Sequence, residues 1–186
     1  MSKTTQGEAI ISHRMALRWL RAYRCRQARG IGSARPLGKA EANALLKRTS
    51  PGRAIICQLF PGVSESKSRI DVLVHNRKNR PRTELAQGHV CSSVLPEGSI
   101  WQARTPGLYV CSPELLFAQM SRTVSYAEAC LLALELCGTF TMRPNMDDCL
   151  YEIAPLTSVA RMAKMLDALG GFGSDSSGLR AANCLM

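Results

Sequence analysis

The chain has 186 residues, 46% of them hydrophobic, which is enough for one domain of ordinary core size. No stretch approaches the roughly 18 consecutive apolar residues of a membrane span, and the start lacks the residue order of a signal peptide. We therefore expect a soluble, cytoplasmic protein. Its eight cysteines are expected to be mostly free thiols, since no export signal accompanies them.

The formal charge of +10 is concentrated in the first half of the chain. Residues 1–90 hold 18 Lys and Arg against 5 Asp and Glu, whereas residues 91–186 hold 6 against 9. A basic half of this kind favours contact with DNA, RNA or an acidic protein partner.

The first nine residues are polar and are expected to form a disordered tail. Residues 9–11 predict a short strand that leads into Ser12, whose hydroxyl would cap a helix over about residues 13–25. The outer side of this helix is the first candidate for phosphate contacts, the alternative being a solvated helix face. The candidate residues are Arg14, Arg18 and Arg21.

Residues 30–60 show loop, helix and strand signals in turn. Gly30 and Gly32 lack the preceding strand and the third glycine of a dinucleotide fingerprint, so residues 30–38 are expected to form a loop. Residues 39–48 predict a short helix. The apolar run over residues 54–60 predicts a buried strand that ends at a Pro-Gly turn.

A basic segment separates two further predicted strands. Residues 70–75 and 89–95 have strand patterns, and together they predict a hairpin with a long basic tip. Mobile Arg and Lys side chains reach a nucleic-acid backbone without a shaped pocket, so the tip is the second candidate for phosphate contacts. The alternative is a charged loop that prevents edge-to-edge aggregation. The candidate residues are Arg77, Lys78, Arg80 and Arg82.

Residues 107–138 carry the clearest local signals. Strand-like residues 108–110 precede Ser112 and Pro113, which predict a helix to about residue 121. Ser125 has capping-box spacing for a second helix to residue 137, which Gly138 would end in the left-handed conformation. We expect this second helix to be largely buried, because several of its faces are apolar. One apolar stripe consists of Ala127, Cys130, Leu131, Leu134 and Cys137.

A last helix is predicted over residues 158–169, capped by Thr157 or Ser158. Residues 171–186 contain too few apolar residues to complete another element and are expected to form a flexible or truncated tail.

Signs of catalysis are weak throughout. Ser64 and Lys67 fit a serine–lysine nucleophile only loosely, and we expect them in a solvated loop. There are no paired carboxylates, no nucleophile with a base and no metal cluster at credible spacing. We therefore expect a protein that is not an enzyme and has no cofactor or bound metal.

Several motifs resemble one family. They are SHRMAL from Ser12, DVLV with the tip RKNRPR from Asp71, LPEGS from Leu95, GLYVCSPE from Gly107, ELCGT from Glu135 and PLTSVAR from Pro155. The order of these motifs resembles that in a group of uncharacterised bacterial proteins. Those proteins are similar to the C-terminal part of AbiEi-type abortive-infection antitoxins. Those proteins are normally followed by a Vsr-like, restriction-fold nuclease domain, which is absent here. The winged helix that opens such antitoxins also lacks a counterpart, and no catalytic residue of the family can be placed.

Together these patterns predict an α+β fold with a small, mostly antiparallel sheet over about residues 54–110 and four or five helices packed on it. A single domain is expected over residues 10–170. The leading hypothesis is an antitoxin-like or nucleic-acid-associated module that binds DNA or RNA backbone through both candidate sets. The alternatives are a protein-interaction module for a separate toxin or nuclease, and the truncated N-terminal part of a Vsr-like endonuclease.

Overall fold

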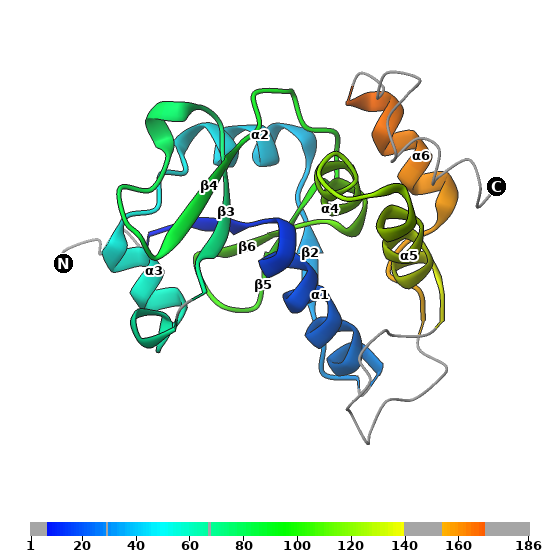
Figure 1. Cartoon of the computed structure of the whole chain (residues 1–186), viewed down its shortest axis with the longest axis horizontal. Coiled ribbons are helices and arrows are strands. Elements are labelled where there is room, and N and C mark those ends of the chain that lie inside the picture. The colour runs from blue at the N-terminus through cyan, green and yellow to red at the C-terminus, as the bar shows by residue number, and fades with distance from the viewer. Residues whose placement is uncertain (1–6, 29, 67, 140–153, 170–186) are drawn as a thin grey trace. The chain divides into compact units, whose positions relative to one another are not determined.

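The computed structural model covers the chain and describes residues 7–28, 30–66, 68–139 and 154–169 (Figure 1). The described residues form six α-helices, two 3-10 helices and six strands, so the α+β class is confirmed. The chain divides into two compact units. Unit 1 comprises Met1–Ala16 and Ala34–Cys111, and unit 2 comprises Leu17–Ser33 and Ser112–Met186. From the sequence we expected one domain over residues 10–170. The sequence pattern does not indicate the division into two units.

Some predicted features lie outside the described residues. They are the C-terminal tail at 171–186, most of the N-terminal tail, and Lys67.

Unit 1 contains a six-stranded sheet with the order β2-β5-β6-β1-β3-β4. The sheet is mixed rather than mostly antiparallel, because β1 runs parallel to β6 and β3 runs parallel to β4. It also includes strands before residue 54, one of which lies in the predicted loop at 30–38. The strands are β1 (Ala9–Ile11), β2 (Ala34–Pro36), β3 (Ile70–Val74), β4 (Ala86–Val90), β5 (Ile100–Ala103) and β6 (Leu108–Cys111).

The predicted strand at 9–11 is confirmed and lies at the centre of the sheet. Ala9, Ile10 and Ile11 have no exposed surface. Ile10 pairs with Tyr109 of β6, and Ile11 pairs with Val72 of β3. A strand covered on both faces is apolar without alternation, which explains why three consecutive apolar residues suffice here.

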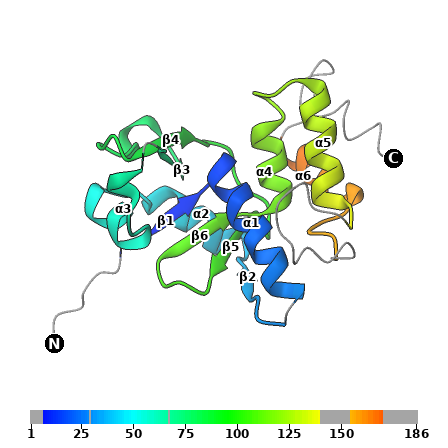
Figure 2. The same cartoon turned by 60° about the horizontal axis from the view of Figure 1, so that its bottom comes forward.

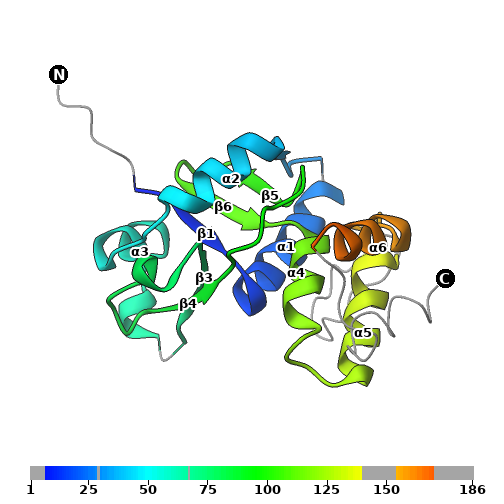
Figure 3. The same cartoon turned by 90° about the horizontal axis from the view of Figure 1, so that it is seen from above.

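Two helices of unit 1 follow β2. Helix α2 (Lys39–Arg48) has the predicted bounds, buries Leu45 and Leu46, and lies along one face of the sheet (Figure 3). Helix α3 (Arg53–Leu59) and the 3-10 helix η1 (Val63–Glu65) come next. The strand predicted at 54–60 is therefore wrong. A short apolar run does not distinguish a strand from a helical segment by periodicity, and here only Ile56 is fully buried.

The hairpin predicted over residues 70–95 is also wrong. Ile70 pairs with Ala86 and Val74 with Val90, so β3 and β4 run in the same direction. Two parallel strands require a crossover connection, which brings the chain back to the end of the sheet at which the first strand began. Residues 75–85 make this return and include the 3-10 helix η2 (Arg77–Asn79). The basic residues consequently lie on a crossover connection rather than at a hairpin tip.

Unit 2 is helical. It contains the part of α1 (His13–Ala28) from Leu17 onward, together with α4 (Pro113–Met120), α5 (Tyr126–Cys137) and α6 (Val159–Ala168). Helix α4 packs against both α5 and α6 (Figure 2). The core of unit 2 includes five fully buried side chains: Leu20, Leu116, Phe117, Leu136 and Met162.

Local capping signals place three of these helices correctly. The Ser112 hydroxyl accepts the Leu115 N–H at 3.2 Å, and Ser158 caps α6 by accepting the Arg161 N–H at 3.3 Å. The capping box between Ser125 and Glu128 at the start of α5 is complete. These contacts satisfy N–H groups that the first helical turn leaves without backbone partners.

The orientation of α5 differs from our expectation. Its predicted apolar stripe is the open face of the helix, with Leu131 47% and Leu134 40% exposed. The opposite positions, including Leu132 and Leu136, form the core. Gly138 ends the helix in an extended conformation with φ −86° rather than in the left-handed one. Since α5 is apolar on most sides, its sequence does not specify which side faces inward.

This orientation gives a test on a single helix. Leu136→Ala removes a fully buried side chain and should lower the free energy of unfolding by about 2 to 5 kcal/mol. Leu131→Ala, at the open stripe, should change it by no more than about 0.5 kcal/mol. Urea denaturation followed by circular dichroism measures both. Equal losses would contradict the orientation of α5.

Candidate nucleic-acid interface

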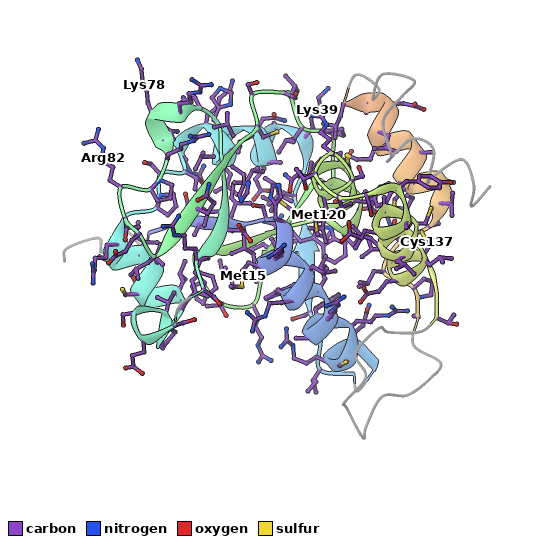
Figure 4. All side chains as sticks on the ribbon, in the orientation of Figure 1. Met15, Lys39, Lys78, Arg82, Met120 and Cys137 are labelled. Atoms are coloured by element: carbon purple, nitrogen blue, oxygen red, sulfur yellow. The ribbon has the colours of Figure 1, made fainter. Side chains whose placement is uncertain are left out.

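The basic segment, residues 76–82, brings together the second predicted set of cations. The four basic side chains of this segment, those of Arg77, Lys78, Arg80 and Arg82, are exposed. None of the four makes an ion pair with another described residue. Lys78 and Arg82 extend away from the ribbon of unit 1 (Figure 4). The four positive charges, Arg77, Lys78, Arg80 and Arg82, are thus available to an external anion.

Two asparagines give the basic segment a defined backbone. The Asn76 side-chain oxygen accepts the N–H groups of Lys78 and Asn79, at 2.9 and 3.1 Å, and so caps η2. The Asn79 amide donates to the carbonyls of Lys47 and Thr49, at 3.1 and 3.4 Å. These hydrogen bonds attach the segment to the end of α2. The basic tip expected from the sequence is instead a turn whose backbone is anchored by hydrogen bonds.

The segment also packs onto β4. A Cβ atom added to Gly88 would lie 2.8 Å from Pro81 Cδ and 3.0 Å from Arg80 Cγ. Because this approach leaves no room for a side chain, glycine allows the segment to lie directly on the strand.

The three predicted arginines of α1 have different environments. Arg14, in unit 1, and Arg18, in unit 2, are exposed and make no ion pair with a described residue. Arg21 donates two hydrogen bonds to the Glu135 carboxylate, at 2.6 and 2.7 Å. The Glu135 side chain is only 3% exposed, and its hydrogen bond raises the pKa of Arg21. Arg21 is thus engaged within unit 2 and is not available on an outer helix face.

Arg24, one helical turn further on, is buried. Its guanidinium donates to the backbone carbonyls of Glu135 and Ala154, both at 3.0 Å, and to that of Gly138. The last carbonyls of a helix have no intrahelical partner, so Arg24 acts as a cap for the end of α5. Two of the five arginines on α1, Arg21 and Arg24, are therefore structural.

Charge is distributed unequally between the units. Unit 1 holds 14 Lys and Arg against 6 Asp and Glu, and unit 2 holds 10 against 8. The net charge of unit 1 is thus +8, against +2 for unit 2. The basic segment therefore lies in the unit that carries most of the positive charge.

Unit 1 also contains a histidine cluster that our sequence analysis missed. The rings of His13 and His89 stack with their centroids 3.7 Å apart. His89 Nε2 lies 2.8 Å from Asp71 Oδ1, and His13 Nδ1 lies 3.1 Å from the hydroxyl of Ser12. Only strand register brings these residues together, because His89 pairs with Leu73 and Ile11 pairs with Val72. No local motif in the sequence signals it.

The cluster keeps His13 neutral near pH 7. Burial and the neighbouring imidazole of His89 lower the pKa of His13 to about 4, against a smaller opposing effect of Asp71. His13 also has a φ of 45°, in the left-handed region, at the start of α1. Within the described part of the chain, no group of three or more His, Cys, Asp or Glu side chains is arranged to hold a metal ion.

The cysteines at the described positions likewise belong to no group that could hold a metal ion. None of the six cysteines there is in a disulfide. Burial, with a contribution from Glu114, raises the pKa of Cys137 to about 11, so this thiol stays protonated at neutral pH. Among the described helices, none combines the length and apolar character that crossing a membrane requires.

Comparison of the chain with family models, curated proteins and solved structures gave no match. The resemblance to AbiEi-type antitoxins therefore stays a prediction that rests on the motifs alone.

The different roles of the α1 arginines are testable. Arg21→Gln leaves the buried Glu135 carboxylate without its bidentate partner and should lower the free energy of unfolding by about 2 kcal/mol. Arg18→Gln, on the same helix but exposed, should change it by less than about 0.5 kcal/mol. Thermal and urea denaturation provide the measurement. An Arg21→Gln variant as stable as Arg18→Gln would show that the ion pair contributes nothing.

The histidine cluster predicts a specific pH dependence. Since the pKa of His13 is lower in the folded protein, the folded state binds fewer protons than the unfolded chain between about pH 6.5 and 4. The contribution of His13 is therefore present above pH 6.5 and is lost as the pH falls toward 4. Asparagine tolerates the left-handed conformation and does not titrate, so His13→Asn should lose less stability than the parent chain over this range. Parallel stability curves for the two proteins would contradict the assignment.

Proposed function

We propose that this protein is a non-enzymatic, antitoxin-like module that binds the phosphate backbone of nucleic acid through the basic segment. The observation that carries the proposal is a set of four exposed cations, without ion pairs among the described residues, on one anchored turn. Exposed arginines and lysines bind phosphates by releasing condensed counterions, independently of base sequence. The net charge of +8 on unit 1 supports the same ligand class, because a positive field attracts polyanions over a distance.

Arg14 and Arg18 remain proposed contacts, since both are exposed. Arg21 is omitted from the proposal because its guanidinium already binds Glu135. The resemblance to AbiEi-type antitoxins supports a nucleic-acid-associated role, although the motifs include no winged helix for reading an operator sequence. The proposal therefore concerns the phosphate backbone, which exposed cations contact independently of base sequence.

The test compares two variants with equal loss of charge. One replaces the four cations of the basic segment with alanine. The control replaces four other exposed cations of unit 1 that also make no ion pair with a described residue: Lys39, Arg53, Arg69 and Arg104. Fluorescence anisotropy with unrelated nucleic-acid sequences, at about 50 and 200 mM salt, gives the affinity and its salt dependence.

We expect the first variant to bind every sequence more weakly and to lose about 0.9 from the salt slope for each phosphate contact removed. The control should lose much less. Equal losses in both variants would assign binding to the overall charge rather than to the basic segment. If the parent protein does not bind at low salt, the proposal fails, and an acidic protein such as a separate toxin or nuclease becomes the next ligand to test.

A further inference from the structure

The attachment of the basic segment to α2 extends the proposed site. Asn79 Nδ2 donates to the carbonyl oxygen of Lys47, and the Ser50 hydroxyl donates to the carbonyl of Asn79 at 3.4 Å. The side chain of Asn79 therefore contacts the last turn of α2, and its backbone contacts Ser50 just after that helix. Lys47 on that turn is joined through its carbonyl to Asn79, which stands in the sequence between Lys78 and Arg80.

The last turn of α2 carries two cations with different roles. Arg48 donates two hydrogen bonds to the Glu8 carboxylate, at 2.7 and 2.8 Å, which lower the pKa of Glu8. Lys47 is exposed and makes no ion pair with a described residue. Of the two, only Lys47 keeps its charge free for a ligand. Its place next to Asn79 follows from pairing across 32 residues of sequence, so no local motif marks it.

The anchoring also bears on the kind of nucleic acid. Hydrogen bonds made by Asn76 and Asn79 fix the segment before any ligand arrives. A segment whose backbone is already fixed loses less conformational entropy than an unanchored loop when its cations meet phosphates that are themselves fixed in space, as they are on a duplex. Proteins that bind single strands combine cations with aromatic side chains on which bases stack. Neither the basic segment nor α2 contains an aromatic residue.

We propose that the ligand of this site is a nucleic-acid duplex, held across the basic segment and the last turn of α2, with Lys47 as a further phosphate contact. Asn79 is a positioning residue, because it holds the two elements together and carries no charge. The proposal rests on the proposed function and specifies both its ligand and an additional residue.

Two lysines at opposite ends of α2 form a matched pair for the test. Lys39 and Lys47 are both exposed and lie about 12 Å apart along the helix axis. Figure 4 shows Lys39 at the other end of this helix. Lys47→Ala, Lys39→Ala and Asn79→Ala are compared with the parent chain by fluorescence anisotropy. The probes are a DNA duplex, an RNA duplex and single strands of equal length, at about 50 and 200 mM salt.

We expect Lys47→Ala to reduce the salt slope by about 0.9, so that the loss of affinity between the two salt concentrations is about threefold smaller than in the parent. Lys39→Ala should behave like the parent protein. Asn79→Ala should weaken binding without removing a charge, and Lys47→Ala should then have a smaller effect in the Asn79→Ala background. Circular dichroism of each variant checks that it is folded, and Lys47→Ala tests the site independently of Asn79→Ala.

Several results would overturn the inference while leaving the proposed function intact. One is binding by the parent protein with equal effects of Lys47→Ala and Lys39→Ala. Another is tighter binding of single strands than of either duplex. If the DNA and RNA duplexes both bind, backbone recognition is supported, and a preference for one of them identifies the natural duplex. Absence of binding by the parent protein contradicts the proposed function itself.

Discussion

The structure of unit 1 depends on a strand of three residues. β1 is hydrogen-bonded to β6 on one side and to β3 on the other, and it alone joins β2-β5-β6 to β3-β4. A strand in this position satisfies its backbone on both edges and buries side chains on both faces, as Ile10 and Ile11 do. The register of β3 on β1 determines where β4 lies, and therefore where the returning basic segment crosses the sheet. A polar side chain at Ile10 or Ile11 would disturb every one of these relations.

The arginines of the chain divide according to what lies within reach of each guanidinium. Arg21 and Arg24 meet a buried carboxylate and a set of helix-terminal carbonyls, and both stabilise the folding of unit 2. Taking a charge out of water is unfavourable unless hydrogen bonds replace those of the solvent, and these two residues have such bonds. Arg77 and Arg82 have no comparable partner among the described residues. Residue type alone is the same in all four cases, so function has to be argued from the environment.

Features that depend on neighbouring residues could be predicted from the sequence, whereas features that depend on distant residues could not. Helix starts at Ser112, Ser125 and Ser158 follow from side chains that bond to N–H groups three residues away. The direction of β4, the inward face of α5 and the pairing of Arg21 depend on residues far along the chain. No local pattern encodes them. The four cations of the basic segment can be named from the sequence, whereas its anchoring by Asn79 to the carbonyl of Lys47 is seen only in the tertiary contacts.

The basic segment combines four exposed cations with a backbone that is fixed by hydrogen bonds. Four like charges within six residues repel one another, and none of the four forms an ion pair with a described acidic residue. An unanchored loop would separate its cations and lower this repulsion. Here Asn76 and Asn79 tie the backbone of the segment down with hydrogen bonds. On the proposed function, an anion with several phosphates would offset this repulsion and meet a backbone that is already in place.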